Sequence, residues 1–167
     1  VALLSSHAYG RPTNPLAPAQ SGSAAPPNSR AQLPVPGEII VMLATNGDGG
    51  IDPQIGRLPQ LRLPPFSAYN TYRLLARHPV TWTAQQPQNI KLPNGRILKT
   101  TLTTLELNQR HRVSASISRP DIDAGERSFL PLLEVTARSG ETFFVAGQSY
   151  QGGVLVVGIR VGLEVTK

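Results

Sequence analysis

The most unusual chemical feature of this sequence is the clustering of its cationic side chains. Residues 57–119 hold ten basic residues and a single acid, Glu106, so this stretch carries a net charge of +9, against +6 for all 167 residues. A surface with such an excess attracts polyanions, and salt weakens that attraction steeply. The alternative is ordinary solubility charge on a wet strand face. The candidate residues for a ligand-binding basic face are Arg73, Arg77, Lys91, Arg96, Lys99, Arg110 and Arg112.

The basic stretch also holds a tryptophan and two tyrosines. Tyr69, Tyr72 and Trp82 are candidates for stacking on sugars or bases. The alternative interpretation places all three rings in the core.

The segment "NGDGGID" is the one candidate metal site. It supplies Asn46, Asp48 and Asp52, the hard oxygen donors that Ca²⁺ prefers. A helix–loop–helix calcium loop would need a glutamate at its twelfth position, which here is Arg57. The favoured interpretation is therefore a glycine-rich turn in which Asp52 caps a helix, with no metal bound.

Groups suited to catalysis are few. The histidines are His7, His78 and His111, and no pattern marks a serine as their nucleophilic partner. Paired carboxylates would have to come from loops that hold Asp48 and Asp52 on one side, and Asp121, Asp123 and Glu126 on the other. The glycines before residue 52 lack the lysine of a phosphate-binding loop. We therefore expect no enzymatic activity and no cofactor.

The elements that carry these residues are mainly β-strands. "EIIVMLA", residues 38–44, is a continuous apolar run typical of a buried strand. Asp52-Pro53 favours a helix start, and Pro59 limits that helix to about residues 53–58. A strand rich in Tyr and Thr is expected at 66–75, after Pro64-Pro65.

The second half of the sequence has clear β signals. Asn94-Gly95 predicts a hairpin, and a change of parity between Leu102 and Leu105 predicts a bulge in the next strand. Residues 111–118 alternate, with Val113, Ala115 and Ile117 on the dry face. "VLVVGIRV" near the end is apolar on both faces, so a central strand is expected there.

These patterns predict one mainly β domain. We expect a single antiparallel β-sandwich or a partly open barrel of seven or eight strands, with one short helix near residues 53–58.

The N-terminal residues 1–36 point to export. "VALLSSHAYG" has an apolar run followed by Ser6 and Ala8 at the −3 and −1 positions of a signal-peptidase site. Residues 1–8 are accordingly expected to be the end of a signal peptide, although an apolar terminus alone would also give this pattern. Residues 9–36 are expected to form a Pro/Ser/Ala-rich tether, and 37–167 the β domain. The chain has no cysteine, so it forms neither a disulfide nor a thiolate metal site. It also has no apolar run of about 20 residues, so no transmembrane segment is expected.

Three stretches carry a resemblance to known proteins: "VMLATNGDGGIDPQIG", "PPFSAYNTYRLL" and "GETFFVAGQSYQGGVLVVGIRV". Over residues 40–161 the chain resembles an uncharacterised group of small exported β-rich proteins of Gram-negative bacteria. The resemblance implies export and a single domain, and it assigns no functional residue. The chain departs from that pattern at Pro59 and Pro64-Pro65, which leaves the length of the helix open.

Together these features predict a non-enzymatic, exported protein of the cell envelope, periplasmic or extracellular. Its expected partner is an anionic surface polymer or an envelope protein. One alternative is a periplasmic hydrolase that uses the acidic loops. The other is an oligonucleotide-binding β barrel, although an exported protein is not expected to meet nucleic acid.

Overall fold

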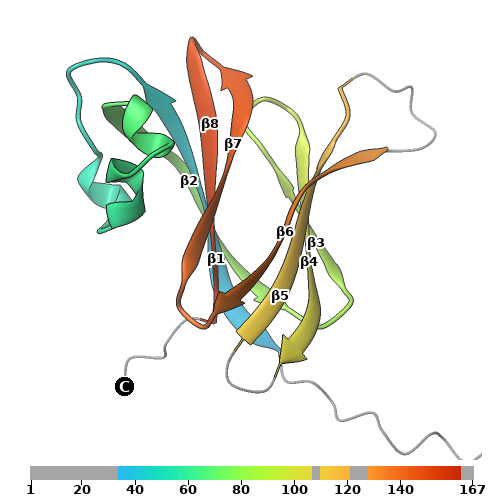
Figure 1. Cartoon of the computed structure of the whole chain (residues 1–167). Helices are drawn as coiled ribbons and strands as arrows, with labels where there is room; N and C mark the ends of the chain where they lie inside the picture. The colour runs from blue at the N-terminus through green and yellow to red at the C-terminus, as the bar shows by residue number, and fades with distance from the viewer. Residues whose placement is uncertain (1–33, 107–109, 121–127, 163–167) are drawn as a thin grey trace, which may run out of the picture. The chain divides into compact units, whose positions relative to one another are not determined.

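The structure is a computed structural model that describes residues 34–106, 110–120 and 128–162, without the side chains of 104–106. Within these residues the chain forms two antiparallel sheets of four strands each (Figure 1). Sheet A has the strand order β2-β1-β8-β7, and sheet B has the order β3-β4-β5-β6. The strands are β1 (Val35–Thr45), β2 (Thr71–Trp82), β3 (Pro87–Lys91), β4 (Ile97–Glu106), β5 (Arg110–Ser118), β6 (Phe129–Arg138), β7 (Thr142–Tyr150) and β8 (Gly153–Val161).

The two sheets pack face to face as a β-sandwich and do not close into a barrel. The mainly β fold that the sequence predicts is confirmed, and of the two architectures that it allows the structure has the sandwich. No ladder joins β2 to β3 or β6 to β7, although each of these pairs is adjacent in sequence. The short connections between them therefore cross from one sheet to the other.

The sandwich core lies between the sheets. β1 and β8 contribute Ile39, Val41, Val157 and Ile159, and sheet B contributes inward residues such as Leu98, Leu102, Val113 and Ile117. Trp82 is fully buried on β2, and its indole N–H donates to the Thr100 hydroxyl of β4 at 3.1 Å, which ties sheet A to sheet B. Gly37 permits this packing, because a Cβ there would overlap both the Trp82 ring and the Arg160 carbonyl.

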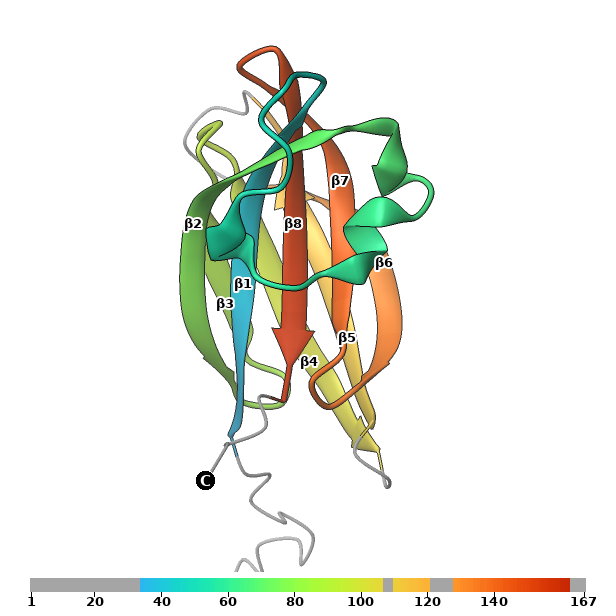
Figure 2. The same ribbon diagram turned by 90° about the vertical axis from the view of Figure 1, so that its left-hand side faces the viewer.

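The outer face of sheet A is covered by residues 46–70, which we call the cap. The cap contains three short 3₁₀ helices: η1 (Pro53–Ile55), η2 (Pro59–Arg62) and η3 (Phe66–Ala68). In Figure 2 it crosses in front of β1 and β8. Cap residues Ile55, Leu58 and Leu61 pack on outward residues of the sheet, among them Ile40, Met42, Ala44, Tyr72 and Val156. This second apolar cluster explains why β1 and β8 have apolar residues on both faces.

Several local predictions are confirmed. Asn94-Gly95 forms the β3–β4 turn, with Gly95 at φ +82°. The pairing of β4 with β5 shifts register between Leu102 and Thr104, where the parity change predicts a bulge. Val113, Ala115 and Ile117 are at most 2 % exposed, and β8 is a central strand.

The helix prediction needs refinement. Asp52 caps a helix as expected and accepts a hydrogen bond from the Gln54 amide at 2.9 Å. The helix is a 3₁₀ turn of three residues, and two further turns follow at η2 and η3. Closely spaced prolines allow isolated turns here but remove the amides that a continuous helix needs. None of the helices among the described residues is long and apolar enough to cross a bilayer.

Two boundaries differ from the expected ones. β1 begins at Val35, two residues before the predicted start of the domain at 37. β2 begins at Thr71, because Phe66–Ala68 forms η3 where a strand is expected from residue 66. The predicted signal-peptide end (1–8) and most of the tether (9–33) lie outside the described residues, as do Asp121, Asp123 and Glu126.

Candidate anion-binding face

The outer face of sheet B is the part of the described surface where predicted basic residues gather. In β5 the residues between Val113, Ala115 and Ile117 point outward, so Arg110, Arg112, Ser114 and Ser116 lie on this face. In β4 the inward Leu98, Thr100 and Leu102 place Lys99 and Thr101 outward. Lys91 follows the buried Ile90 at the end of β3 and is exposed. Four of the seven candidate basic residues therefore share one face: Lys91, Lys99, Arg110 and Arg112.

Sheet pairing adds a cation that the sequence prediction missed. Arg138 of β6 lies directly opposite Arg110 of β5 in the register, and both are exposed. Like charges at opposed positions of a sheet repel each other. The backbone of Glu106 lies on the other side of Arg110. The alternation of exposed Glu134, Thr136 and Arg138 with inward neighbours was the available sequence signal for Arg138.

The cations on this face differ in how they are held. The Lys99 ammonium sits 4.1 Å from the centroid of the Phe129 ring, a cation–π contact that positions the side chain. Arg112 forms an exposed ion pair with Glu134, 3.7 Å between Nη1 and Oε1. Among the residues that the structure describes, the side chains of Arg110 and Arg138 have no ion pair or hydrogen bond. Both residues are exposed.

A groove of about 610 Å³ lies beside Lys99 on this face, and Arg110, Arg112 and Arg138 are not among its lining residues. The pairing of β5 with β6 shifts register between Ala115 and Ser116, which both line the groove. Lys99 pairs with Ser116, and Ser116 is six residues from Arg110 along β5, so the two cations are about 20 Å apart at about 3.3 Å per residue. The groove is lined by the polar residues Lys99, Thr101, Ser114, Ser116 and Glu134 and by the apolar residues Ala115, Pro131, Leu132 and Leu133.

The other three candidate basic residues do not lie on this face. The Arg73 guanidinium approaches Gln151 in the β7–β8 turn at 3.4 Å, and Arg96 donates to Gln148 of β7. Arg77 lies on β2 and contacts the cap. The prediction of one face that contains all seven residues is therefore wrong, because β2 belongs to sheet A and Arg96 reaches across the end of the sandwich.

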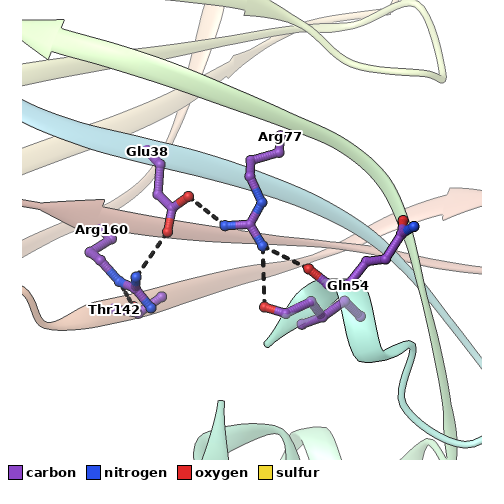
Figure 3. A network of polar contacts seen from close by, with 6 residues as sticks. Glu38, Gln54, Arg77, Thr142 and Arg160 are labelled. Atoms are coloured by element: carbon purple, nitrogen blue, oxygen red, sulfur yellow. Dashed lines mark hydrogen bonds and ion pairs between the residues drawn. The ribbon is translucent and has the colours of Figure 1, made fainter. Parts of the chain in front are cut away.

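Arg77 belongs to a structural network under the cap (Figure 3). It forms an ion pair with Glu38 of β1 and donates to the carbonyls of Gln54 at 3.0 Å and Ile55 at 3.2 Å. Arg160 of β8 pairs with the other Glu38 oxygen at 2.9 Å and donates to the Thr142 hydroxyl. The Glu38 side chain is only 12 % exposed, so its charge needs these partners. The network holds η1 against sheet A.

Two of the three candidate stacking aromatics are core residues. Trp82 is completely buried, and Tyr72 is 1 % exposed beneath the cap. The Tyr72 hydroxyl donates to the Phe66 carbonyl at 2.6 Å, and burial, with a smaller contribution from Tyr69, raises the pKa of Tyr72. The stacking role is therefore wrong for Trp82 and Tyr72, and the oligonucleotide-binding alternative loses its platform along with its barrel. Tyr69 is half-buried and borders a cavity in the cap.

The predicted oxygen cluster is a turn. One carboxylate oxygen of Asp52 accepts from the Gln54 amide and the other from the Leu74 amide at 3.2 Å. Asn46 and Asp48 are exposed in the loop before it. Among the described residues, no three histidine or acidic side chains are placed to hold a metal ion.

His111 comes closest to a catalytic arrangement. Its Nε2 lies 2.7 Å from the Ser139 hydroxyl, and burial lowers the pKa of the imidazole. Nδ1 is buried and has no hydrogen-bond partner, whereas a catalytic histidine is held there by a carboxylate. His111 faces the core, opposite Ala137, as its parity with Val113 predicts.

Comparison of the chain with protein-family models, with curated proteins and with solved structures finds no match. The resemblance to small exported proteins of Gram-negative bacteria therefore stays a prediction, and the function has to be argued from the chain's own residues.

Proposed function

We propose that this protein is a non-enzymatic binding module of the bacterial cell envelope, exported to the periplasm or the cell exterior. In this proposal the outer face of sheet B binds an extended anionic polymer. The single observation that carries it is the gathering of five cations on this face, Lys91, Lys99, Arg110, Arg112 and Arg138, with a groove beside Lys99 that Thr101, Ser114 and Ser116 help to line.

The spacing favours an elongated ligand. Cations about 20 Å apart along the strand direction match the repeated charges of an acidic polysaccharide better than one small anion. Thr101, Ser114 and Ser116 offer hydroxyl groups between them, which can exchange hydrogen bonds with sugar hydroxyls. Glu134 lowers the net charge of the groove, but it lies in an ion pair with Arg112.

The unpartnered cations support the same proposal. Arg110 and Arg138 lie opposite each other, and neither side chain has a described partner, so the fold gains little from them. A polyanion that neutralises both would relieve their repulsion. Export is supported by the sequence pattern around Ser6 and Ala8 and by the absence of cysteine.

The test is retention of the full chain on heparin resin and on immobilised lipopolysaccharide across a salt gradient. Lys99→Glu and Arg110→Glu are compared with Arg73→Glu, which changes the net charge equally but lies on sheet A. We expect the two sheet B variants to elute at clearly lower salt than the Arg73 variant, because only they reverse a charge that contacts the polymer.

Equal shifts for all three variants would reduce the effect to net charge and contradict the proposal. Elution of the unmodified chain at low salt would also contradict it, as would stronger competition by duplex DNA than by acidic polysaccharide. Export has its own test, since the protein recovered from the periplasm of a cell making the precursor should begin at Tyr9.

A further inference from the structure

The cap contains a second candidate site, on the opposite sheet from the anion-binding face. A cavity of about 450 Å³ lies between η1 and η2, which is within the size range of pockets for small molecules. Its wall is apolar at Ile51, Leu58 and Pro59, and the two arginines of the cap, Arg57 and Arg62, stand beside it. We call it the cap pocket.

The walls of the cap pocket are held in place before any ligand arrives. Ile55, Leu58 and Leu61 are each at most 7 % exposed and anchor η1 and η2 in the second apolar cluster. Arg77 holds the carbonyls of Gln54 and Ile55 from below. A pocket with fixed walls loses little conformational entropy on binding.

The cations of the cap pocket are exposed and unpaired. Among the described residues neither Arg57 nor Arg62 forms a hydrogen bond or an ion pair. The nearest acid is Asp52, which also lines the pocket, but both of its carboxylate oxygens accept backbone amides. Residues 53–105 contain no acid. The pocket therefore keeps a net positive charge beside an apolar wall.

A neighbouring cavity extends this surface. It has a volume of about 420 Å³ and shares Ile51 and Arg62 with the cap pocket, so Arg62 stands between the two. Its other walls include Leu61, Tyr69 and Tyr72. Polar Ser67 and Asn70 also line this cavity, and Leu61 and Tyr72 are at most 2 % exposed, so Ile51 and the Tyr69 ring are what it offers to an apolar chain beside Arg62.

We propose that the cap pocket binds a small amphipathic carboxylate, with the carboxylate paired to Arg57 and Arg62 and the apolar chain lying over Ile51 and Leu58. Guanidinium groups match the planar geometry of a carboxylate and form charge-assisted hydrogen bonds with it. The apolar wall adds affinity by removing the chain from water. This site lies on sheet A and does not depend on polymer binding by sheet B.

The test is an NMR titration of the full ¹⁵N-labelled chain with octanoate below its micelle-forming concentration. Acetate supplies the charge without the chain, and octylammonium supplies the chain with the opposite charge. We expect octanoate to shift the amides of Ile51, Leu58 and Arg62 and to bind at least about tenfold more tightly than either control compound.

Two variants complete the test. R57Q/R62Q should bind octanoate about tenfold more weakly, while its dispersed spectrum reports an intact fold, because neither arginine has a partner to lose. Arg73→Gln removes a β2 charge outside the pocket and should bind like the unmodified chain. The proposal is overturned if octanoate binds no better than octylammonium, if its shifts map outside the cap, or if R57Q/R62Q binds as tightly as Arg73→Gln.

Discussion

The outer faces of the two sheets have opposite chemistry. On sheet A the outward residues of β1, such as Ile40 and Met42, are completely buried beneath the cap. On sheet B the outward residues of β5 are serines and exposed arginines, and nothing in the described structure covers them. A continuous apolar strand needs a cover on both faces, whereas an alternating strand needs one. The comparison indicates that the cap is part of the core, while no described residue covers the outer face of sheet B.

The largest effect is expected from truncating one outward residue on each sheet. Ile40→Ala should lower the free energy of unfolding by about 2–5 kcal/mol, because it leaves a cavity under the cap. Ser114→Ala on the central strand β5 should change it by less than about 0.5 kcal/mol. Urea unfolding, followed by the emission of the buried Trp82, measures both. A similar loss in the two variants would mean that the outer face of sheet B is also covered.

The acidic residues of the two faces offer a second matched pair. Glu38→Gln should destabilise the fold by about 2 kcal/mol, because it leaves Arg77 and Arg160 around a half-buried site without their counter-charge. Glu134→Gln removes an exposed pair with Arg112 and should cost at most about 1 kcal/mol. Thermal unfolding of both variants at one salt concentration makes the comparison. If Glu134→Gln proved the more damaging change, the network under the cap would not be what holds η1.

A smaller effect is expected where the cap meets β2. Tyr72→Phe loses the hydrogen bond to the Phe66 carbonyl and should cost about 1 kcal/mol. Burial raises the pKa of Tyr72 in the folded protein, so above about pH 10 the unfolded chain releases this proton first and stability falls. Urea midpoints at pH 8 and pH 11 should therefore fall less for Tyr72→Phe than for the unmodified chain. Equal falls would indicate that Tyr72 ionises without opening the cap.

The smallest effect is expected at the inner face of sheet B. Burial lowers the pKa of His111, so the folded protein resists protonation and the unfolded chain takes up the proton below about pH 6.5. The stability of the unmodified chain should accordingly fall between pH 7 and pH 5. The stability of His111→Gln should fall less over the same interval. Denaturant midpoints of both proteins at the two pH values test this. An equal fall of the midpoint in the unmodified chain and in His111→Gln would show that His111 is protonated in the folded state.

Local signals predicted the elements of sheet B well. Alternation placed Val113, Ala115 and Ile117 inward and Arg112, Ser114 and Ser116 outward, and Asn94-Gly95 located the β3–β4 turn. These features depend on neighbours in sequence, since side chains in a strand alternate and a tight turn needs glycine. The cap gave no such signal. Its buried residues Ile55, Leu58 and Leu61 follow no strand period, and Pro59 interrupts the segment that holds them.

The basic residues show the same difference between what local sequence predicts and what strand pairing decides. Lys99, Arg110 and Arg112 share a face because their strands pair, and Arg138 joins them only through the register of β5 with β6. Arg73, Arg77 and Arg96 carry the same charge in the same stretch of sequence, yet each contacts a different partner elsewhere. Charge counting cannot separate these groups, because it contains no information on which strands belong to which sheet.

The sequence by itself determined the strands, the hairpin, the bulge and the excess of positive charge, since each follows from residue types a few positions apart. The tertiary structure alone decided which strands share a sheet, that the cap covers β1, and that Trp82 and Tyr72 are buried while Arg110 and Arg138 are exposed. The physical reason is that pairing and burial depend on contacts between residues far apart in the chain, and one local pattern is compatible with several such arrangements.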